Sequence, residues 1–328
     1  MSNLTFDQIT QPISADLDDI ERILIEETAI QYDFVDQAVR HVVEGGGKRL
    51  RPILVILSGQ ACGYSSDDSY IPAACVELIH VASLVHDDVL DEAPIRRGRT
   101  TLHSKWGNKV AVLVGDYLHA RVLNMLVSRK ADDPALAILS EAAQAMCEGE
   151  VIHAYKNGVF EISLPDYLDI VSLKTGRLIL ASCRIGAVIA TDQADKIQAM
   201  ASYGGAIGTA FQIIDDLLDF TAEQEKFGKR SFNDLREGKL TFPMIYARQQ
   251  CTAKEREKLE IIFNTEFEEE QTIRWIRQLI GRYQVEDHCL QVAQDYANRA
   301  KLALRSLPET PARTALEHLA DYLVSRDR

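Results

Sequence analysis

Apolar residues recur three and four positions apart along nearly the whole chain, and this spacing limits what the chain can fold into more than any other feature. Segments such as LAILSEAAQAMCEGEVIHAY and AMASYGGAIGTAFQIIDDLLDF keep the spacing over several turns, which gathers their apolar side chains on one helix face. No convincing pair of strands accompanies them. We therefore predict an all-α fold, a large helical bundle of roughly ten or more helices.

Prolines and nearby capping residues indicate where helices begin, and stretches rich in Pro, Gly or Ser would indicate domain boundaries. Four prolines stand where a helix could begin, and Asp133 and Ser163 are nearby as caps. These prolines are Pro72, Pro134, Pro165 and Pro311. No stretch rich in Pro, Gly or Ser divides the 328 residues, and no shift in composition marks a boundary. Residues 1–328 are therefore expected to form a single domain.

Composition and charge exclude several classes of protein. The net charge of −13 opposes electrostatic capture by nucleic acid or anionic lipid. Six cysteines stand singly, without a CxxC pair, which is typical of a reducing compartment. The first residues lack an apolar signal core, and the best membrane-span candidate, residues 169–190, is interrupted by Lys174, Arg177 and Arg184. We expect a cytoplasmic protein without a transmembrane segment.

Two clusters of aspartates each close an apolar helical segment. The first lies in LVHDDVLDEAPIRRGRTTLH and the second in FQIIDDLLDF. Their members are Asp87, Asp88 and Asp91, and then Asp215, Asp216 and Asp219. Alone, such a cluster is more often a solvated helix end. Because both the spacing and the context are repeated, a functional cation site is favoured over chance surface composition.

The type of ligand indicates which cation and which substrate. Carboxylate oxygens are hard ligands that suit magnesium or manganese, and neither cluster has the loop of a calcium-binding EF-hand. Magnesium is usually held by one or two carboxylates together with phosphate oxygens of a substrate. Basic residues that could bind phosphate follow each cluster: Arg96, Arg97 and Arg99, then Lys229, Arg230, Arg236 and Lys239. For each of them, a surface ion pair with a nearby acid is the alternative.

A third basic element is EGGGKRLRP, which contains Lys48, Arg49 and Arg51. Alone, it is more often a glycine-terminated helix end with cations near the last carbonyls. It is not a Walker phosphate loop, because that motif needs GxxxxGK followed by Ser or Thr between a strand and a helix.

Together these segments resemble the trans-polyprenyl diphosphate synthases of medium- or long-chain type. The two aspartate clusters match the family's two aspartate-rich motifs, and GGGKRLRP, ELIH, LVGDYL, AMCEGE, SLKTG and NDLREGKLTFP match in order. The resemblance covers nearly the whole chain. It implies an isoprenoid synthase-like bundle around a central cavity, and a homodimer, for which LHARVLNMLV could supply an interface or core.

The resemblance also implies roles for individual residues. The metal ligands would be Asp87, Asp88, Asp91, Asp215, Asp216 and Asp219, facing each other over the cavity and sharing three magnesium ions, with manganese as a substitute. The allylic diphosphate would be bound by Arg96, Lys174, Lys229 and Lys239. Isopentenyl diphosphate would be bound by Lys48, Arg51, His80 and Arg97. Thr175 and Gln212 would lie beside the reacting carbons. The catalytic set would be Asp87, Asp88, Asp91, Lys174, Thr175, Gln212, Asp215 and Lys229. Gly176 stands where relatives commonly carry alanine, which alters the local wall.

The chemistry agrees with this resemblance. Magnesium and basic side chains stabilise charge on a leaving diphosphate, so that an allylic diphosphate (geranyl, farnesyl or geranylgeranyl) can ionise. The double bond of isopentenyl diphosphate then attacks, and a proton is lost to the departed diphosphate. No activated side-chain nucleophile is evident. His80 and His86 lie nearest the chemistry, and packing or capping explains them at least as well as acid–base catalysis.

Product length is expected to depend on the residues one turn before Asp87. These are Ala82 and Ser83, and no Phe, Tyr or Trp occurs between Tyr70 and Asp91. A helical turn rises about 5.4 Å, comparable to one extended isoprene unit, so a missing aromatic floor allows further additions. We predict a hexaprenyl to nonaprenyl product. Candidate floor residues are Leu123, Met125 and Leu126, with core packing as the alternative.

Two other functions remain alternatives. A class I terpene cyclase shares the fold and the ionisation step but normally carries a different second metal motif. A non-catalytic partner subunit of a heteromeric prenyl synthase tends to lose aspartates, and none is missing here.

Overall fold

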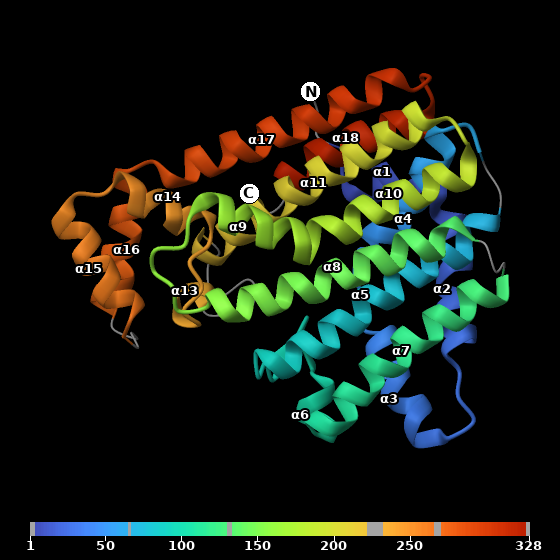
Figure 1. The fold of residues 1–328 in the computed structure, drawn as a ribbon, viewed down its shortest axis with the longest axis horizontal. Coiled ribbons are helices and arrows are strands. Elements are labelled where there is room, and N and C mark those ends of the chain that lie inside the picture. The colour runs from blue at the N-terminus through green and yellow to red at the C-terminus, as the bar shows by residue number, and fades with distance from the viewer. Residues whose placement is uncertain (1–3, 65–66, 130–132, 222–231, 266–269, 326–328) are drawn as a thin grey trace. The chain divides into compact units, whose positions relative to one another are not determined.

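The computed structural model describes residues 4–64, 67–129, 133–221, 232–265 and 270–325, and it is almost entirely helical (Figure 1). The predicted all-α fold is confirmed. The chain divides into two compact units, each assembled from segments that are distant in sequence. Unit 1 comprises residues 1–143, 178–204 and 303–319, and unit 2 comprises residues 144–177, 205–302 and 320–328. The single domain and the central cavity stay predictions.

The first half of the chain supplies most of unit 1. Its helices are α1 (Phe6–Thr10), α2 (Ser14–Thr28), α3 (Asp33–Val43), α4 (Leu50–Ala61), α5 (Tyr70–Leu90), α6 (Leu102–Trp106) and α7 (Asn108–Arg129). Almost all of α10 (Arg177–Ala190) and the greater part of α18 (Pro311–Ser325) belong to it as well. The helices α8 (Pro134–Lys156) and α11 (Ala194–Thr221) contribute to both units.

The core of unit 1 is built around α5. Val76, Leu78 and Ile79 are buried in this helix, which packs against α2, α4 and α7. Figure 1 shows α5 and α7 side by side. Burial of each such side chain stabilises the fold by about 1.5–3 kcal/mol, so this core fixes the helix that ends in the first acidic cluster.

Unit 2 contains the remaining elements. They are α9 (Leu164–Val171), a π-helix (Ser172–Gly176), α13 (Asn233–Arg236), α14 (Phe242–Gln250), α15 (Ala253–Phe263), α16 (Glu270–Arg282) and almost all of α17 (Val285–Ala303). Aromatic rings pack within this unit, where the half-buried His288 stacks on Tyr246 with 3.8 Å between the ring centroids. Arg248 is buried and donates a hydrogen bond to the carbonyl of Ile162 at 2.6 Å.

All four expected prolines lie in the first turn of a helix, although Pro72 is the third residue of α5 rather than the first. Pro134 and Pro311 are the first residues of α8 and α18, and Pro165 lies at the start of α9. The carboxylate of Asp133 accepts a hydrogen bond from the amide of Ala135 at 2.9 Å, and the hydroxyl of Ser163 accepts one from the amide of Asp166 at 3.1 Å. All six cysteines are free, in line with their single spacing.

One described helix, α7, is long and apolar enough to cross a membrane by length and composition alone. It is not the segment that the sequence singled out, since residues 169–190 are divided among α9, the π-helix and α10. Because α7 packs along α5 within unit 1, its apolar composition also suits a core helix.

Candidate active site

The first acidic cluster lies at the carboxyl end of α5, where its members differ in exposure. Asp88 is buried and accepts a hydrogen bond from Nε of Arg96 at 2.5 Å. Burial raises the pKa of Asp88, although the Arg96 contact opposes this. Asp87 is half-buried and Asp91, which caps the helix, is exposed. Arg96 thus forms the ion pair that was the alternative to phosphate binding.

A short hairpin follows this cluster, contrary to the expectation that no strand pair would form. Strand β1 (Ile95–Arg96) pairs antiparallel with β2 (Arg99–Thr100). Arg97 and Gly98 form the turn with φ angles of 50° and 74°. Two consecutive positive φ angles are typical of the two-residue turns that join tight hairpins. The RRG segment is therefore a turn, which the search for alternating apolar residues could not detect.

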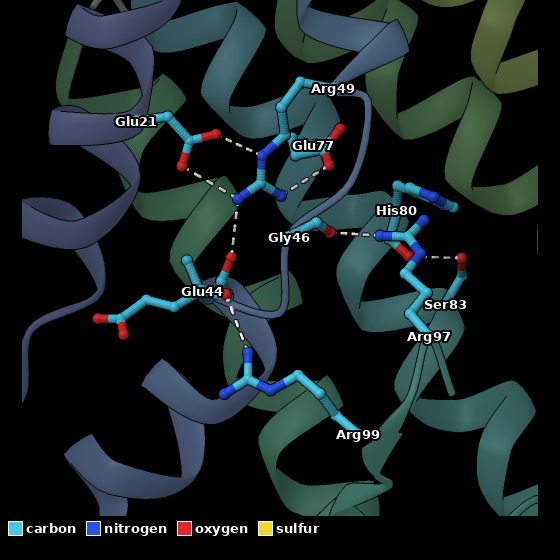
Figure 2. Close-up of polar contacts among 10 residues, drawn as sticks. Glu21, Glu44, Gly46, Arg49, Glu77, His80, Ser83, Arg97 and Arg99 are labelled. Carbon is cyan, nitrogen blue, oxygen red and sulfur yellow. Dashed lines mark hydrogen bonds and ion pairs between the residues drawn. The ribbon is translucent and has the colours of Figure 1, made fainter. Parts of the chain in front are cut away.

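The hairpin arginines contact the glycine-rich segment before α4. Arg97 donates to the carbonyl of Gly46, and Arg99 donates to the carbonyl of Glu44 at 3.0 Å (Figure 2). A bound diphosphate could exchange for these carbonyls, because guanidinium groups bind phosphate oxygens more strongly than neutral acceptors.

A pocket in unit 1 lies between the hairpin, α5 and the glycine-rich segment. Its lining includes Gly46, Glu77, His80, Asp88, Arg96 and Arg97. The space within this lining, part of it open to solvent, is about 560 Å³. The pocket is thus rich in cationic groups at the point where the first acidic cluster begins.

Burial tunes the charged groups near this pocket. It lowers the pKa of Arg51 to about 10, and Nε of Arg51 is buried without a hydrogen-bond partner among the described residues. Burial, followed by the charges of Arg51 and Arg97, lowers the pKa of His80 well below its ordinary value. His80 is therefore neutral at pH 7. Lys48 is exposed, with its ammonium 5.6 Å from the ring centroid of Phe6.

The second acidic cluster lies near the end of α11 in unit 2, and its three aspartates have different surroundings. Asp215 is exposed. Asp216 is buried, and it accepts hydrogen bonds from Nε2 of Gln212 at 2.8 Å and from the hydroxyl of Tyr167. Asp219 accepts from the backbone amides of Asn233 at 3.1 Å and the following residue at 3.2 Å. Burial raises the pKa of Asp216 to about 7.

The π-helix carries Lys174 and Thr175. The hydroxyl of Thr175 donates to Oε1 of Gln212 at 2.9 Å, which links this turn to Asp216. Nζ of Lys174 lies 2.6 Å from a carboxylate oxygen of Glu150 and 2.9 Å from Nδ1 of His153. Single π turns within helices occur frequently at functional sites.

Not every predicted phosphate-binding residue joins these groups. Nζ of Lys239 lies 2.7 Å from a carboxylate oxygen of Glu237, so it has a neighbouring acid as partner. Lys229 and Arg230 lie outside the described residues.

Four polar residues of these sites were not singled out from the sequence. Glu77 had a signal, since it is a lone acid in the apolar segment VELIHVASLV. Glu150 ends AMCEGE, one of the matched motifs, whereas Tyr167 and His153 had no signal, because their partners lie 49 and 21 residues away.

The acidic clusters fit magnesium by the chemistry of their donors. All six side chains offer carboxylate oxygens, which are the ligands that magnesium prefers. Among the described residues, no three His, Cys, Asp or Glu side chains are grouped so that they alone could hold a metal ion. Magnesium rarely uses such an all-protein cage, since waters and phosphates complete its shell.

The residues expected to set product length lie in two different environments. On α5, Ala82 is buried and Ser83 is half-buried, with its hydroxyl donating to the carbonyl of His80 at 2.9 Å. On α7, Met125 and Leu126 are buried, consistent with the core-packing alternative, whereas Leu123 is 53% exposed.

Comparisons with known proteins agree with this assembly of motifs. A family model described as polyprenyl synthetase matches residues 32–280. The octaprenyl diphosphate synthase of Escherichia coli K12 is 32% identical, over 99% of this chain and 100% of that protein. Heptaprenyl diphosphate synthase component 2 of Bacillus subtilis 168 is 36% identical, over 99% of this chain and 92% of that protein. A solved structure of polyprenyl synthase from Caulobacter crescentus CB15, complexed with calcium and isoprenyl diphosphate, matches with a TM-score of 0.93 and 35% identity over 100% of both chains. The chain therefore belongs to the polyprenyl synthetase family and is a prenyltransferase.

Proposed function

We propose that this enzyme extends an allylic diphosphate by successive additions of isopentenyl diphosphate in a magnesium-dependent reaction. The main support is the cationic pocket that includes Asp88, where Arg97 of the hairpin turn and the neutral His80 of α5 are brought together. Forked guanidinium groups suit a diphosphate, and a neutral imidazole can donate a hydrogen bond without adding charge. The allylic substrate would be geranyl, farnesyl or geranylgeranyl diphosphate.

Each substrate would use one group of residues. Isopentenyl diphosphate would bind the unit 1 pocket through Lys48, Arg51, His80 and Arg97. Among the described residues the buried Nε of Arg51 has no hydrogen-bond partner, which supports this role, because a buried donor gains most from an anionic partner. The allylic diphosphate would bind Arg96, Lys174, Lys229 and Lys239.

The acidic clusters would hold magnesium. When bound, magnesium would supply positive charge to the leaving diphosphate. The ligands would come from Asp87, Asp88, Asp91, Asp215, Asp216 and Asp219, with three ions per site and manganese as a substitute. The exposed Asp91 and Asp215 are accessible to solvent, as hydrated ions require.

The chain's own polar groups would orient the reacting carbons. Thr175 donates to Gln212, Gln212 donates to Asp216, and Tyr167 donates to the same carboxylate. Because every bond in this row points toward Asp216, one orientation of the Gln212 amide is favoured. Thr175 and Gln212 would line the space beside the ionised allylic carbons. The proton released after condensation would pass to the departed diphosphate, so no side-chain base is needed.

The product would be hexaprenyl to nonaprenyl diphosphate. The small side chains of Ala82 and Ser83 leave no aromatic floor one turn before Asp87. The octaprenyl and heptaprenyl names of two relatives support this range.

We propose a homodimer that works in the cytoplasm. The exposed Leu113, Leu123 and Val127 on α7 support a protein interface, because large apolar side chains gather there on one helix. The Bacillus subtilis relative is named as one component of its synthase, so a heteromeric partner is the alternative.

Purified enzyme incubated with magnesium, farnesyl diphosphate and radiolabelled isopentenyl diphosphate tests the activity directly. Linear polyprenyl diphosphates of six to nine isoprene units are expected by mass spectrometry. A cyclic hydrocarbon product would indicate a terpene cyclase, and the absence of any product would indicate a non-catalytic partner subunit. Asp87→Ala and Asp215→Ala variants should each lose turnover; full turnover in both would remove the acidic clusters as metal sites.

A further inference from the structure

Arg49 occupies an unusual position between two residues assigned to isopentenyl diphosphate, Lys48 and Arg51. It precedes α4 with φ of 47° and ψ of 37°, in the left-handed region. Residues other than glycine rarely adopt this backbone conformation, and it persists only when surrounding contacts hold it. The contacts of Arg49 therefore identify what holds the segment in place.

The guanidinium of Arg49 is engaged on all sides. Nε and Nη2 both contact the carboxylate of Glu21, the second at 3.0 Å, and Nη1 contacts Oε1 of Glu77 at 3.0 Å (Figure 2). Nη2 also donates to the carbonyl of Val43 at 2.9 Å. The Arg49 side chain is only 10% exposed and that of Glu77 only 5% exposed. This fork joins α2, α5 and the end of α3 beneath the glycine-rich segment.

The hairpin arginines contact the same segment from a different element. Arg97 and Arg99 bind the carbonyls of Gly46 and Glu44. Gly47 has φ of 143°, a conformation that other residues rarely adopt, and a Cβ atom there would lie 2.4 Å from Nη1 of Arg97, so the Arg97 side chain would have to move. Three glycines in a row lose much conformational freedom on ordering, which means that the segment needs an anchor. Arg49 provides such an anchor.

Glu77 connects the anchor to the pocket. Its Oε1 pairs with Arg49, and its Oε2 is buried without a hydrogen-bond partner among the described residues. Glu77 lines the pocket together with Gly46, His80 and Arg97. Removing Arg49 would take away the cation that is hydrogen-bonded to the buried Glu77, leaving this carboxylate to the charges of Arg51 and Arg97, and would also free the segment that presents Lys48.

We propose that Arg49 is a positioning residue for isopentenyl diphosphate: through Glu21 and Glu77 it holds residues 44–49 and neutralises Glu77, so that Lys48, Arg51 and Arg97 are in place before the substrate binds. Arg49 itself does not touch the substrate. This inference rests on the proposed function, and it concerns one substrate only. It therefore predicts different effects on the KM for isopentenyl diphosphate and the KM for the allylic diphosphate.

Steady-state kinetics with each substrate varied in turn tests this role. Arg49→Met removes the ion pairs with Glu21 and Glu77. Arg49→Lys keeps the charge but loses the two-nitrogen contact with Glu21. Glu21→Gln weakens the contact with α2, while Glu77 stays paired with Arg49. Arg22→Met is the matched control, because Arg22 also bridges two carboxylates, Asp19 and Glu26, but on the exposed face of α2. Circular dichroism confirms that each variant is folded.

The KM for isopentenyl diphosphate should rise roughly tenfold or more in Arg49→Met, since small displacements of binding groups have large kinetic effects. Arg49→Lys and Glu21→Gln should give smaller rises. The KM for the allylic diphosphate should stay within about twofold, and Arg22→Met should change neither constant. If Arg49→Met does not fold, Glu21→Gln decides the outcome.

Two results would overturn the inference: unchanged constants in the folded variants, or equal rises for both substrates, which would indicate general loosening. A wild-type enzyme that makes no product would instead refute the proposed function. The two failures are thus distinguishable.

Discussion

At the scale of single residues, the two acidic clusters share a pattern of burial that their identical spacing does not reveal. In each, the second aspartate is buried and held by protein donors: Asp88 by Arg96, and Asp216 by Gln212 and Tyr167. Buried carboxylates need such partners, since an unpaired charge away from water is costly. These hydrogen bonds orient the two carboxylates at their helix ends, while Asp91 and Asp215 are exposed at the same ends.

Replacing Ser83 tests the assignment of product length. The Ser83→Phe variant should make shorter products, because an aromatic ring one turn before Asp87 would block the growing chain. Ser140→Phe is the matched control, since the hydroxyls of both serines donate to a carbonyl three residues earlier at 2.9 Å within a helix. Mass spectrometry of the products measures the change. Identical product lengths in wild type and Ser83→Phe would remove this assignment.

At the scale of elements, the π-helix depends on the glycine that faces it from α8. A Cβ atom at Gly149 would lie 2.7 Å from Cβ of Leu173 and 3.0 Å from the amide of Lys174. At Gly176, by contrast, the nearest described atom to such a Cβ would be the carbonyl oxygen of Val171 at 3.7 Å. Only the first glycine is therefore required sterically, although Gly176 was the one that stood out as a departure from relatives.

A pair of alanine substitutions tests this contrast. Gly149→Ala should destabilise the protein by roughly 1–3 kcal/mol through overpacking and should lower turnover by displacing Lys174. Gly176→Ala should be neutral or stabilise by up to about 1 kcal/mol, because alanine restricts the unfolded chain. Urea denaturation and turnover assays measure both. Equal losses in the two variants would contradict the steric explanation.

At the scale of the whole molecule, buried carboxylates should make the stability of the metal-free protein depend on pH. Burial raises the pKa of Asp216 from 3.8 to about 7 and raises that of Asp234 well above its ordinary value. The folded state therefore binds more protons than the unfolded state between these values, so stability falls as pH rises from about 4 to 7.

Metal-free enzyme in EDTA should consequently be less stable at pH 8 than at pH 5.5, on the order of 1–3 kcal/mol. Asp216→Asn should reduce this dependence, because asparagine cannot ionise, and should leave the part that comes from Asp234. Magnesium should restore stability at pH 8 if it binds the ionised cluster. Chemical denaturation across this pH range provides the measurement, and equal stability at both pH values would argue against a raised pKa.

Assembly is the second property at this scale. Leu123→Asp should shift the enzyme from dimer to monomer in sedimentation, because it places a charge in the proposed α7 interface. Leu302→Asp is the control, since Leu302 is 59% exposed and Leu123 is 53% exposed. A monomeric wild-type enzyme, or dissociation in both variants, would contradict the homodimer.

The fold class and the motif positions could be predicted from sequence because both depend on local patterns. Apolar spacing predicted the helices, and a run of aspartates at the end of an apolar segment predicted where α5 and α11 carry their clusters. The hairpin and the π-helix were missed, since each is only a few residues long. Turn geometry there depends on single positive φ angles, as at Arg97, rather than on periodicity.

The sequence by itself determined the helices, the acidic helix ends and the supply of cationic residues, because these follow from neighbours within one or two turns. Only the tertiary structure decided which charges meet. Arg49 pairs with Glu77, which is 28 residues away in the sequence, and Tyr167 donates a hydrogen bond to Asp216, which is 49 residues away. Such pairs form when helices pack, and a single polar residue in the sequence does not indicate which distant residue will contact it.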